Sequence, residues 1–389
     1  SAVESPAAGA ATIDVAAVQA ALGAQHLDGW LLYSFRDLNP IATGLTAVDR
    51  QGGHLATRRW YYFIPAQGEP RSLVHAIESR ALAHLPGRSA LYAGRDQLER
   101  GLASLIAGAR RVAMEYSPNC AIPYIARVDA GTVELIRSLG TEVVSSGDLV
   151  QLFSAVWSPS AIETHGAASE KLYRIKDRAF DAIAERTRAH RTTTEFEIQA
   201  LMTGWFAAEG LISDSPPMVA ASENAGNPHY MPTAAHSRVI GGDQLVLLDL
   251  WGKVDRPGAV FADITWVGYT GTQVPEPYAR AFAAICEARD AAVALVRHAA
   301  QTGRDLRGWE VDRAATSVIR AAGYGDRILH RTGERRNPGD FGRSEAGSPL
   351  LLFRQRNLHR AHPLRGELDA VRVFPVSDAM TSPVLRRTQ

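Results

Sequence analysis

Hydrophobic and polar positions follow two different patterns along the chain. Up to about Ser154, short apolar runs alternate with stretches of helical periodicity, which is the pattern of an α/β domain. The runs are WLLYS, WYYFIPA, RSLVHAI, RRVAMEY and TEVVSS, at residues 30–34, 60–66, 71–77, 110–116 and 141–146. We therefore expect an N-terminal α/β domain over residues 1–155.

The pattern changes to longer helices near Trp157. Ser158 and Pro159 form a typical helix start, with serine as the N-cap and proline in the first turn. The helix that follows, to about His190, is predicted to carry four apolar residues on one face: Leu172, Ile175, Ala179 and Ile183. We expect this helix to open a second domain, over residues 158–389.

An antiparallel hairpin and further helices are predicted within the second domain. Thr194 and Glu197 form a capping box at the start of another helix. The apolar runs at 245–252 and 259–269 flank a turn signal, Pro257–Gly258, and predict two paired strands. Two helical stretches follow, at residues 279–300 and 308–322. With the strands expected after them, this order of elements predicts an α+β domain.

Composition and charge exclude several classes of partner. The chain has 42 Lys and Arg residues against 41 Asp and Glu, and neither sign forms a long block, so no nucleic acid or anionic membrane partner is expected. No apolar run approaches the roughly 20 residues that span a bilayer, which predicts no membrane association and a cytoplasmic location. Cys120 and Cys286 fit neither a disulfide framework nor a CxxC motif, and we expect both to be reduced core residues.

Two aspartates interrupt the otherwise apolar strands of the predicted hairpin. Asp249 and Asp263 would be costly to bury unless a cation or hydrogen-bond donors pair with them. In an antiparallel hairpin both carboxylates can reach one face, where two hard oxygen ligands suit a divalent metal ion. Alternatively, both are strand-end aspartates with solvated or capped carboxylates, and their spacing alone does not decide between the two.

The sequence around these aspartates resembles the pita-bread metallopeptidases. The runs NPHY, GDQLVLLDLWG and FADITW are similar to the first half of the catalytic signature of methionine aminopeptidase, aminopeptidase P and prolidase, with creatinase as a metal-free relative. Three earlier segments resemble the N-terminal domain of prolidase-like members, at residues 27–41, 57–78 and 112–136. The resemblance, which is strong up to Gly333, implies an α/β N-terminal domain followed by an α+β pita-bread catalytic domain.

The resemblance also implies a set of ligands for up to two divalent ions. In the family the ligands are two aspartates, a histidine and two glutamates, and Asp249 and Asp263 match the first two. Their separation is three residues longer than usual, an insertion that the predicted turn can absorb. His229 matches a family histidine that contacts substrate and helps to stabilise the tetrahedral intermediate; its alternative is a histidine on a surface loop.

The segment that should supply the ligand histidine departs from the family. HRTG, at residues 330–333, is normally followed by that histidine, but position 334 is Glu, and no histidine lies between His330 and His359. Glu334 is either an oxygen ligand or an exposed charge beside two arginines. A site of carboxylates still suits a hard ion such as Mn²⁺, while an imidazole-preferring ion such as Zn²⁺ loses more.

Two registers are possible for the glutamate ligands. In the first, Glu345 is the fourth ligand and a catalytic residue, and Glu367 is the nearest candidate for the fifth. In the second, Arg343–Glu345 is itself the final R-x-E motif, and the penultimate glutamate is lost. The runs VRVFPVSD and TSPV, which resemble the closing strand and tail of family members, favour the first register.

Residues and resemblance together predict a metallopeptidase of the Xaa-Pro dipeptidase or aminopeptidase P type. We expect a prolidase-like dipeptidase with an atypical metal site, Mn²⁺ as the favoured ion with Co²⁺ or Zn²⁺ as alternatives, a small Xaa-Pro peptide as substrate and, from the resemblance, a homodimer. Two alternatives stay open: a creatinase-like, metal-free hydrolase with His229 as the acid–base group, and a non-catalytic binding protein that keeps the pita-bread cavity. The two aspartates favour the peptidase, and the missing histidines favour the alternatives.

Overall fold

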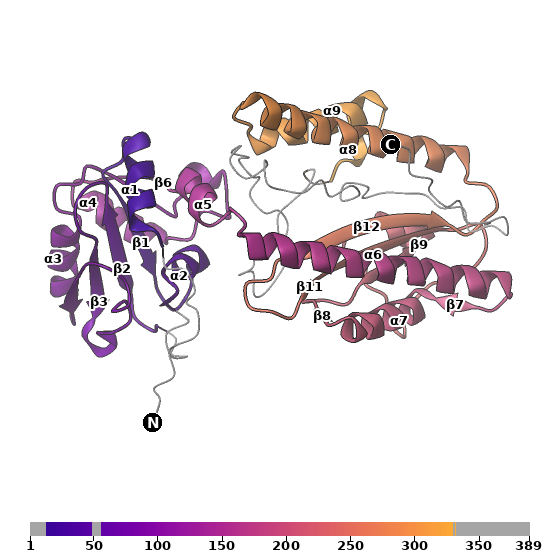
Figure 1. The fold of residues 1–389 in the computed structure, drawn as a ribbon, viewed down its shortest axis with the longest axis horizontal. Helices are drawn as coiled ribbons and strands as arrows, with labels where there is room; N and C mark the ends of the chain where they lie inside the picture. The colour runs from indigo at the N-terminus through magenta and orange to yellow at the C-terminus, as the bar shows by residue number, and fades with distance from the viewer. Residues whose placement is uncertain (1–12, 49–55, 330, 332–389) are drawn as a thin grey trace. The chain divides into compact units, whose positions relative to one another are not determined.

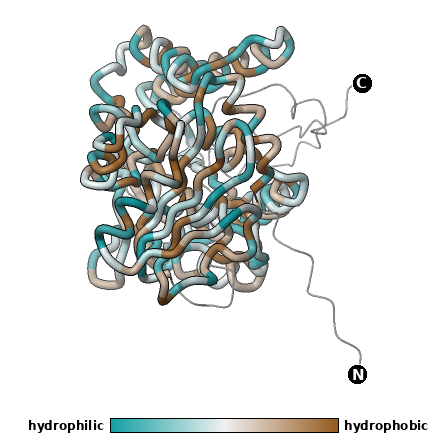
Figure 2. Tube along the Cα trace, turned by 90° about the vertical axis from the view of Figure 1, so that its left-hand side faces the viewer, coloured by the Kyte–Doolittle hydropathy of each residue, from teal (hydrophilic) through white to brown (hydrophobic). Residues whose placement is uncertain are grey.

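The chain divides into two units, Ser1–Val156 and Trp157–Gln389, in a computed structural model that describes residues 13–48, 56–329 and 331. Each unit is built on its own sheets (Figure 1). Hydrophobic and hydrophilic positions alternate along the helices, as expected for elements that pack one face against a core (Figure 2).

The described part of the first unit contains a six-stranded mixed sheet with the strand order β4-β3-β2-β1-β5-β6. Its strands are β1 (Gly29–Ser34), β2 (Trp60–Pro65), β3 (Arg71–His75), β4 (Arg88–Tyr92), β5 (Arg111–Met114) and β6 (Glu142–Ser145). Strand β2 runs antiparallel to its neighbours β1 and β3, and the other pairs are parallel. The strands β1, β3, β4 and β5 therefore all point the same way.

Helices cover both faces of this sheet (Figure 1). They are α1 (Val15–Ala24), α2 (Pro40–Thr46), α3 (Arg95–Leu105), α4 (Ala130–Ser138) and α5 (Gly147–Phe153), with short 3₁₀ turns η2 (Ala76–Glu78) and η3 (Pro118–Cys120). Residues of α1, α2 and α5 share a core with Trp30, Leu32 and Tyr62, while those of α3 and α4 share one with Leu31 and Tyr61. Burial on both faces explains why β1 and β2 read as continuous apolar runs.

A four-stranded antiparallel sheet and a two-stranded ribbon form among the described residues of the second unit. The strands are β7 (Thr193–Thr194), β8 (Leu211–Ile212), β9 (Met218–Ala221), β10 (Val239–Ile240), β11 (Leu245–Val254) and β12 (Ala262–Tyr269). The long strand β11 pairs with β12 along one edge and with β8 and β9 along the other, and β10 pairs with β7. The predicted hairpin is thus confirmed.

The helices that accompany this sheet are α6 (Pro159–Arg188), α7 (Glu195–Ala208), α8 (Glu276–Thr302) and α9 (Gly308–Ala321), with 3₁₀ turns η4 (Ser222–Gly226) and η5 (Gly325–Arg327). As predicted, the Ser158 hydroxyl caps α6 by accepting a hydrogen bond from the Ala161 amide at 3.1 Å. The predicted core residues of α6 are fully buried: Leu172, Ile175, Ala179 and Ile183. They pack against β11 and β12.

Some expectations differ from the structure. Strand β4 was not predicted, because four of its five residues are exposed and it therefore lacks an apolar run. Cys120 and Cys286 are not joined in a disulfide, but the expectation of core positions was wrong: Cys120 is exposed at the end of η3 and Cys286 is half-buried on α8. The strands expected near the C-terminus fall outside the described residues. Among the described helices, none combines the length and apolar character that crossing a membrane requires.

Candidate functional site

The β11–β12 register places Asp249 and Asp263 on the same face of the sheet. Asp249 lies opposite Thr265, and Asp263 lies opposite Trp251. Residues that face each other in an antiparallel pair point to the same side, and so do residues two apart along a strand. The two aspartates are therefore diagonal neighbours across the hairpin, a spacing at which side chains of adjacent strands still interact.

The opposite face of the hairpin is the one that packs against α6. It carries the buried residues Val246, Leu248, Leu250, Ala262, Ile264 and Trp266. The face with the aspartates is less buried: Asp249 is half-buried and Asp263 is exposed. The alternation of apolar and polar positions along β11 thus keeps the carboxylates out of the core, where an ionised group would be costly.

Neighbouring side chains orient this face. The Thr265 hydroxyl donates a hydrogen bond to Asp249 Oδ1 at 2.8 Å. The indole of Trp251, which is the cross-strand neighbour of Asp263, donates to Asp214 Oδ1 at 2.5 Å. The first of these contacts is of the kind that orients a ligating carboxylate, because it occupies one lone pair and restricts rotation of the group.

The carboxylates of Asp249 and Asp263 fit part of a site for a hard divalent ion. Two carboxylates on one sheet face offer the oxygen ligands that Mn²⁺ prefers. Within the described ranges, no group of three or more His, Cys, Asp or Glu side chains is arranged to hold a metal ion. The other predicted ligands, Glu345 and Glu367, lie outside the described residues, as does Glu334. Of the predicted ligands, the structure therefore describes Asp249 and Asp263.

His229 lies on a tight turn that follows β9 and η4. Asn227 accepts a hydrogen bond from the His229 amide on its side-chain oxygen at 3.1 Å, and from the Tyr230 amide on its carbonyl at 3.0 Å. This is a β-turn with asparagine first and proline second, the positions at which both residues are favoured. The His229 side chain is exposed. The structure thus presents the imidazole to solvent on a conformationally restricted turn.

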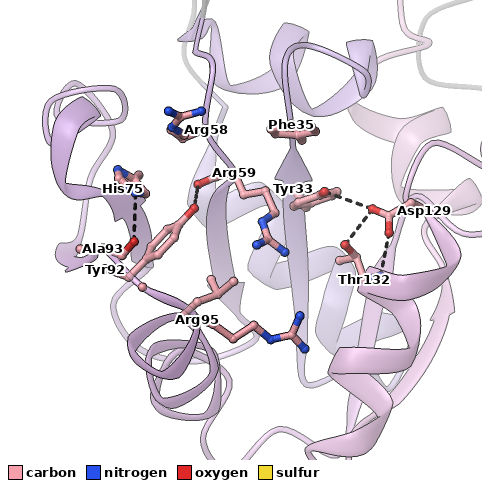
Figure 3. A pocket seen from close by; sticks show the side chains of 12 residues that line it. Tyr33, Phe35, Arg58, Arg59, His75, Tyr92, Ala93, Arg95, Asp129 and Thr132 are labelled. Carbon is pink, nitrogen blue, oxygen red and sulfur yellow. Dashed lines mark hydrogen bonds between the residues drawn. The ribbon is translucent and has the colours of Figure 1, made fainter.

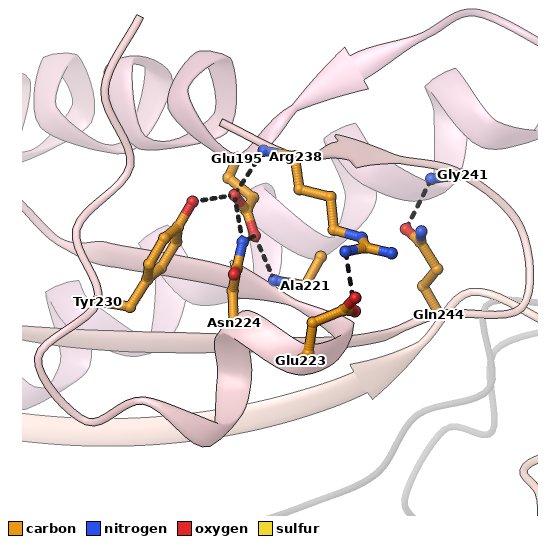
Figure 4. A network of polar contacts seen from close by, with 8 residues as sticks. All are labelled: Glu195, Ala221, Glu223, Asn224, Tyr230, Arg238, Gly241 and Gln244. Atoms are coloured by element: carbon orange, nitrogen blue, oxygen red, sulfur yellow. Dashed lines mark hydrogen bonds and ion pairs between the residues drawn. The ribbon is translucent and has the colours of Figure 1, made fainter. Parts of the chain in front are cut away.

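A buried carboxylate, Glu195, anchors the segment on both sides of this turn (Figure 4). Glu195 is fully buried in the first turn of α7. Hydrogen bonds are donated to it by the Ala221 amide at 2.6 Å, the Asn224 side chain at 3.0 Å, the Tyr230 hydroxyl at 2.5 Å and the Arg238 amide at 2.7 Å. These neutral hydrogen-bond donors, together with the helix N-terminus, replace the water around the carboxylate. The carboxylate can therefore be buried without a cation beside it.

Two of the donors to Glu195, Tyr230 and Arg238, follow His229 in the sequence. Burial, followed by the hydrogen bond to Glu195, raises the pKa of Tyr230 to about 12, so its hydroxyl stays protonated and donates at neutral pH. Arg238 also pairs through its guanidinium with Glu223 at 2.8 Å (Figure 4). Sequence reasoning missed Glu195, because a glutamate in the first helical turn is usually an exposed partner of the helix dipole.

Comparison with known proteins agrees with this geometry. Residues 167–335 match the profile of metallopeptidase family M24. This match lies within the second unit. The M24 match covers most of α6, the hairpin and the His229 turn, and the family predicted from the sequence is confirmed. No curated protein sequence matches the chain.

Solved structures support the folds of the two units. A dipeptidase, PepE, from Mycobacterium ulcerans has a TM-score of 0.56 and 20% identity, covering 81% of this chain and 78% of the other. A dipeptidase from Pyrococcus horikoshii OT3 has a TM-score of 0.52 and 20% identity, covering 87% of each chain. An X-prolyl aminopeptidase from Caenorhabditis elegans, a cytosolic enzyme with a di-nuclear active site, has a TM-score of 0.50 and 15% identity, covering 79% of this chain and 48% of the other. The expected fold class, an α/β domain followed by a pita-bread domain, is confirmed.

Proposed function

We propose that this protein is a metal-dependent peptidase that hydrolyses Xaa-Pro bonds, with a metal site that departs from the family pattern. The observation that carries the proposal is the register that brings Asp249 and Asp263 to one face of the hairpin. Two aspartates in these positions are suited to bind divalent cations. A metal-free hydrolase or a non-catalytic binding protein would not require such a pair. The M24 match over the same strands supports peptidase chemistry.

The names of the structural relatives support the substrate class. Two are dipeptidases and one is an X-prolyl aminopeptidase. The di-nuclear site of the Caenorhabditis elegans enzyme supports up to two ions in this chain. Because the ligands are oxygen atoms, we favour Mn²⁺ over Zn²⁺ and Co²⁺. The proposal includes the N-terminal domain at 1–155, the catalytic domain at 158–389, a homodimer and a cytoplasmic location.

Each predicted site residue has a role in the proposed reaction. Asp249 and Asp263 would hold the metal, and Glu345 and Glu367 would complete its coordination, with Glu345 also acting as a base. When bound there, a divalent ion would supply a Lewis acid and would lower the pKa of a coordinated water. His229, on its restricted turn, contacts the substrate and stabilises negative charge on the carbonyl oxygen by donating a hydrogen bond.

The test uses the purified full chain, loaded with Mn²⁺ and then freed of excess ion. Metal content and the hydrolysis of an Xaa-Pro dipeptide are measured together, with an Xaa-Ala dipeptide as the specificity control. Asp263→Asn should lower both metal content and turnover. Asp255→Asn is the matched control, because Asp255 is an exposed aspartate in the turn of the same hairpin.

Two results would contradict the proposal. A chain that binds no divalent ion at millimolar concentration and leaves Xaa-Pro dipeptides intact is not this peptidase. Hydrolysis that continues undiminished in a chelator, and depends on His229 but not on Asp263, would instead support a metal-free, creatinase-like reaction.

A further inference from the structure

A pocket of about 490 Å³ lies in the first unit, lined by none of the residues assigned above (Figure 3). Its lining includes Tyr33, His75 and Tyr92, from the carboxyl ends of the mutually parallel strands β1, β3 and β4. Arg95 and Thr132 line it from the first turns of α3 and α4. Ligands of sheets that contain parallel strands commonly bind in this position, and the volume is that of a small-molecule site.

The charge of the lining favours an anion. Arg58, Arg59 and Arg95 line the pocket, and the acidic residue of its lining is Asp129. Both oxygens of Asp129 are already engaged, since the Tyr33 hydroxyl donates to one at 3.1 Å and Thr132 donates to both. The carboxylate therefore serves as the cap of α4 and leaves the guanidinium groups as the dominant charges of the pocket.

Arg59 is central to the pocket. Its side chain is half-buried and its guanidinium lies between the rings of Tyr33 and Tyr92 (Figure 3). In the part of the chain that the structure describes, no carboxylate forms an ion pair with it. A partly buried cation without a counter-ion is unfavourable, and a bound anion would compensate it.

Arg95 is available to bind a ligand, whereas His75 is occupied by other hydrogen bonds. Arg95 contacts Glu99 at 2.6 Å, but both side chains are exposed, so this pair contributes little and can rearrange when a ligand arrives. His75 uses both ring nitrogens: Nε2 lies 3.2 Å from the Ala93 carbonyl, and Nδ1 accepts from the Ile77 amide at 3.3 Å. His75 thus forms part of the wall, and the anion-binding groups are arginines.

A buried hydroxyl that has no acceptor among the described residues, that of Tyr61, lies beside the same groups. Tyr61 is directly opposite Tyr33 in the β1–β2 register, with ring centroids 5.0 Å apart, and is fully buried. Its hydroxyl makes no hydrogen bond within the described residues. Burial raises its pKa, and its electrostatic neighbours include Tyr33, Arg59 and Tyr92, all of which line the pocket. An unsatisfied buried donor costs about 1–3 kcal/mol, which a water bridging to the ligand would recover.

The start of α3 adds a favourable dipole. The N-cap of this eleven-residue helix is Gly94, which provides no side-chain cap. The amides of the first turn and the positive end of the helix dipole favour an anion at this end of the pocket. The cavity, a guanidinium that forms no ion pair within the described residues and a hydroxyl that has no acceptor there are separate observations, and all favour the same kind of ligand.

We propose that this pocket binds a small oxyanion of the phosphate or carboxylate class. Arg59 and Arg95 hold its oxygens through paired N–H donors, and Tyr61, which does not itself line the pocket, donates a further hydrogen bond through a water. The rings of Tyr33, Phe35 and Tyr92 form an aromatic wall suited to a planar organic group attached to the anion. This site is independent of the peptidase proposal.

The test is calorimetric titration of the full chain with inorganic phosphate, phenyl phosphate and benzoate. We expect at least one of them to bind; tighter binding of phenyl phosphate than of inorganic phosphate would identify an organic ligand, and equal affinity would identify free phosphate. Arg59→Gln and Arg95→Gln should each weaken binding about tenfold or more. Arg100→Gln is the matched control, because Arg100 is exposed on α3 and outside the pocket lining.

Two further variants separate binding from folding. Tyr61→Phe should weaken binding several-fold while leaving thermal stability unchanged or higher, since it removes an unsatisfied hydroxyl. If Arg59→Gln does not fold, Arg95→Gln carries the test, because its side chain is exposed. The proposal is overturned if no probe binds at millimolar concentration, or if Arg100→Gln weakens binding as much as Arg95→Gln.

Discussion

The Tyr230 hydroxyl donates a 2.5 Å hydrogen bond to the buried carboxylate of Glu195, and so joins the turn that carries His229 to the first turn of α7 (Figure 4). The Arg238 amide makes a second such contact from the far side of the segment. These contacts connect Glu195 to the segment around His229 and not to the aspartate pair. We therefore assign it a positioning part, in which it restricts the His229 turn.

Replacement of Glu195 should loosen that turn and destabilise the protein. Glu195→Gln puts an amide donor where several donors now converge, so we expect a loss of about 1.5–3 kcal/mol in the free energy of unfolding. Tyr230→Phe should cost about 1 kcal/mol. Denaturant titration measures both. Glu223→Gln, an exposed position on the same segment, is the control and should change stability little. Equal stability of Glu195→Gln and the wild type would contradict this assignment.

Thr265 should affect metal affinity without affecting the fold. Thr265→Val keeps the shape of the side chain but removes the hydroxyl that donates to Asp249. Loss of a contact that orients a ligand typically lowers metal affinity about 10–100-fold. Mn²⁺ titration of the purified variant tests this, with Thr265→Ser as the variant that retains the donor. Unchanged affinity in Thr265→Val would show that Asp249 is not a ligand oriented in this way.

The residue at position 334 should determine how the metal preference of this site differs from that of the family. If Glu334 stands where the family has its ligand histidine, Glu334→His should tighten binding and shift the preference from Mn²⁺ toward Zn²⁺ or Co²⁺, because imidazole suits these ions better. Competition between metals, measured on the variant and the wild type, gives the result. Arg335→His places the same imidazole one residue further along the chain and is the control. The same metal preference in Glu334→His and the wild type would place residue 334 outside the site.

Glu115 in the first unit should make stability depend on pH. It is fully buried, and burial raises its pKa, although hydrogen bonds from Trp30, Asn39 and Ser146 partly oppose the shift. A carboxyl whose pKa is raised on folding stabilises the protein below its ordinary pKa of 4.5, and this contribution is lost as pH rises through the folded value. Relative to Glu115→Gln, the wild type should therefore lose stability as pH rises above 4.5. Parallel unfolding curves across that range would exclude the effect.

Local patterns in the sequence were sufficient for most of the fold. The hairpin strands, the helix after Ser158 and the capping box at Thr194 and Glu197 could be predicted, because periodicity and capping depend on residues close in the chain. Strand β4 could not, since an edge strand with exposed residues has no such pattern. The two aspartates were recognisable because carboxylates interrupt apolar strands, and the register then placed them on one face.

The sequence by itself therefore determined the main helices and the hairpin with its two aspartates, because these patterns depend on residues near one another in the chain, and its motifs indicated the family. Only the tertiary structure showed the surroundings of Glu195, Arg59 and Tyr61. The donors to Glu195 come from β9, the following loop and the segment before β10, so its burial depends on contacts that no local pattern contains. Likewise, Tyr61 belongs to an apolar run, and only the packing around it shows that its hydroxyl has no acceptor within the described residues. Hydrogen bonds between distant segments form only when the chain folds, which is why these two features became visible only in three dimensions.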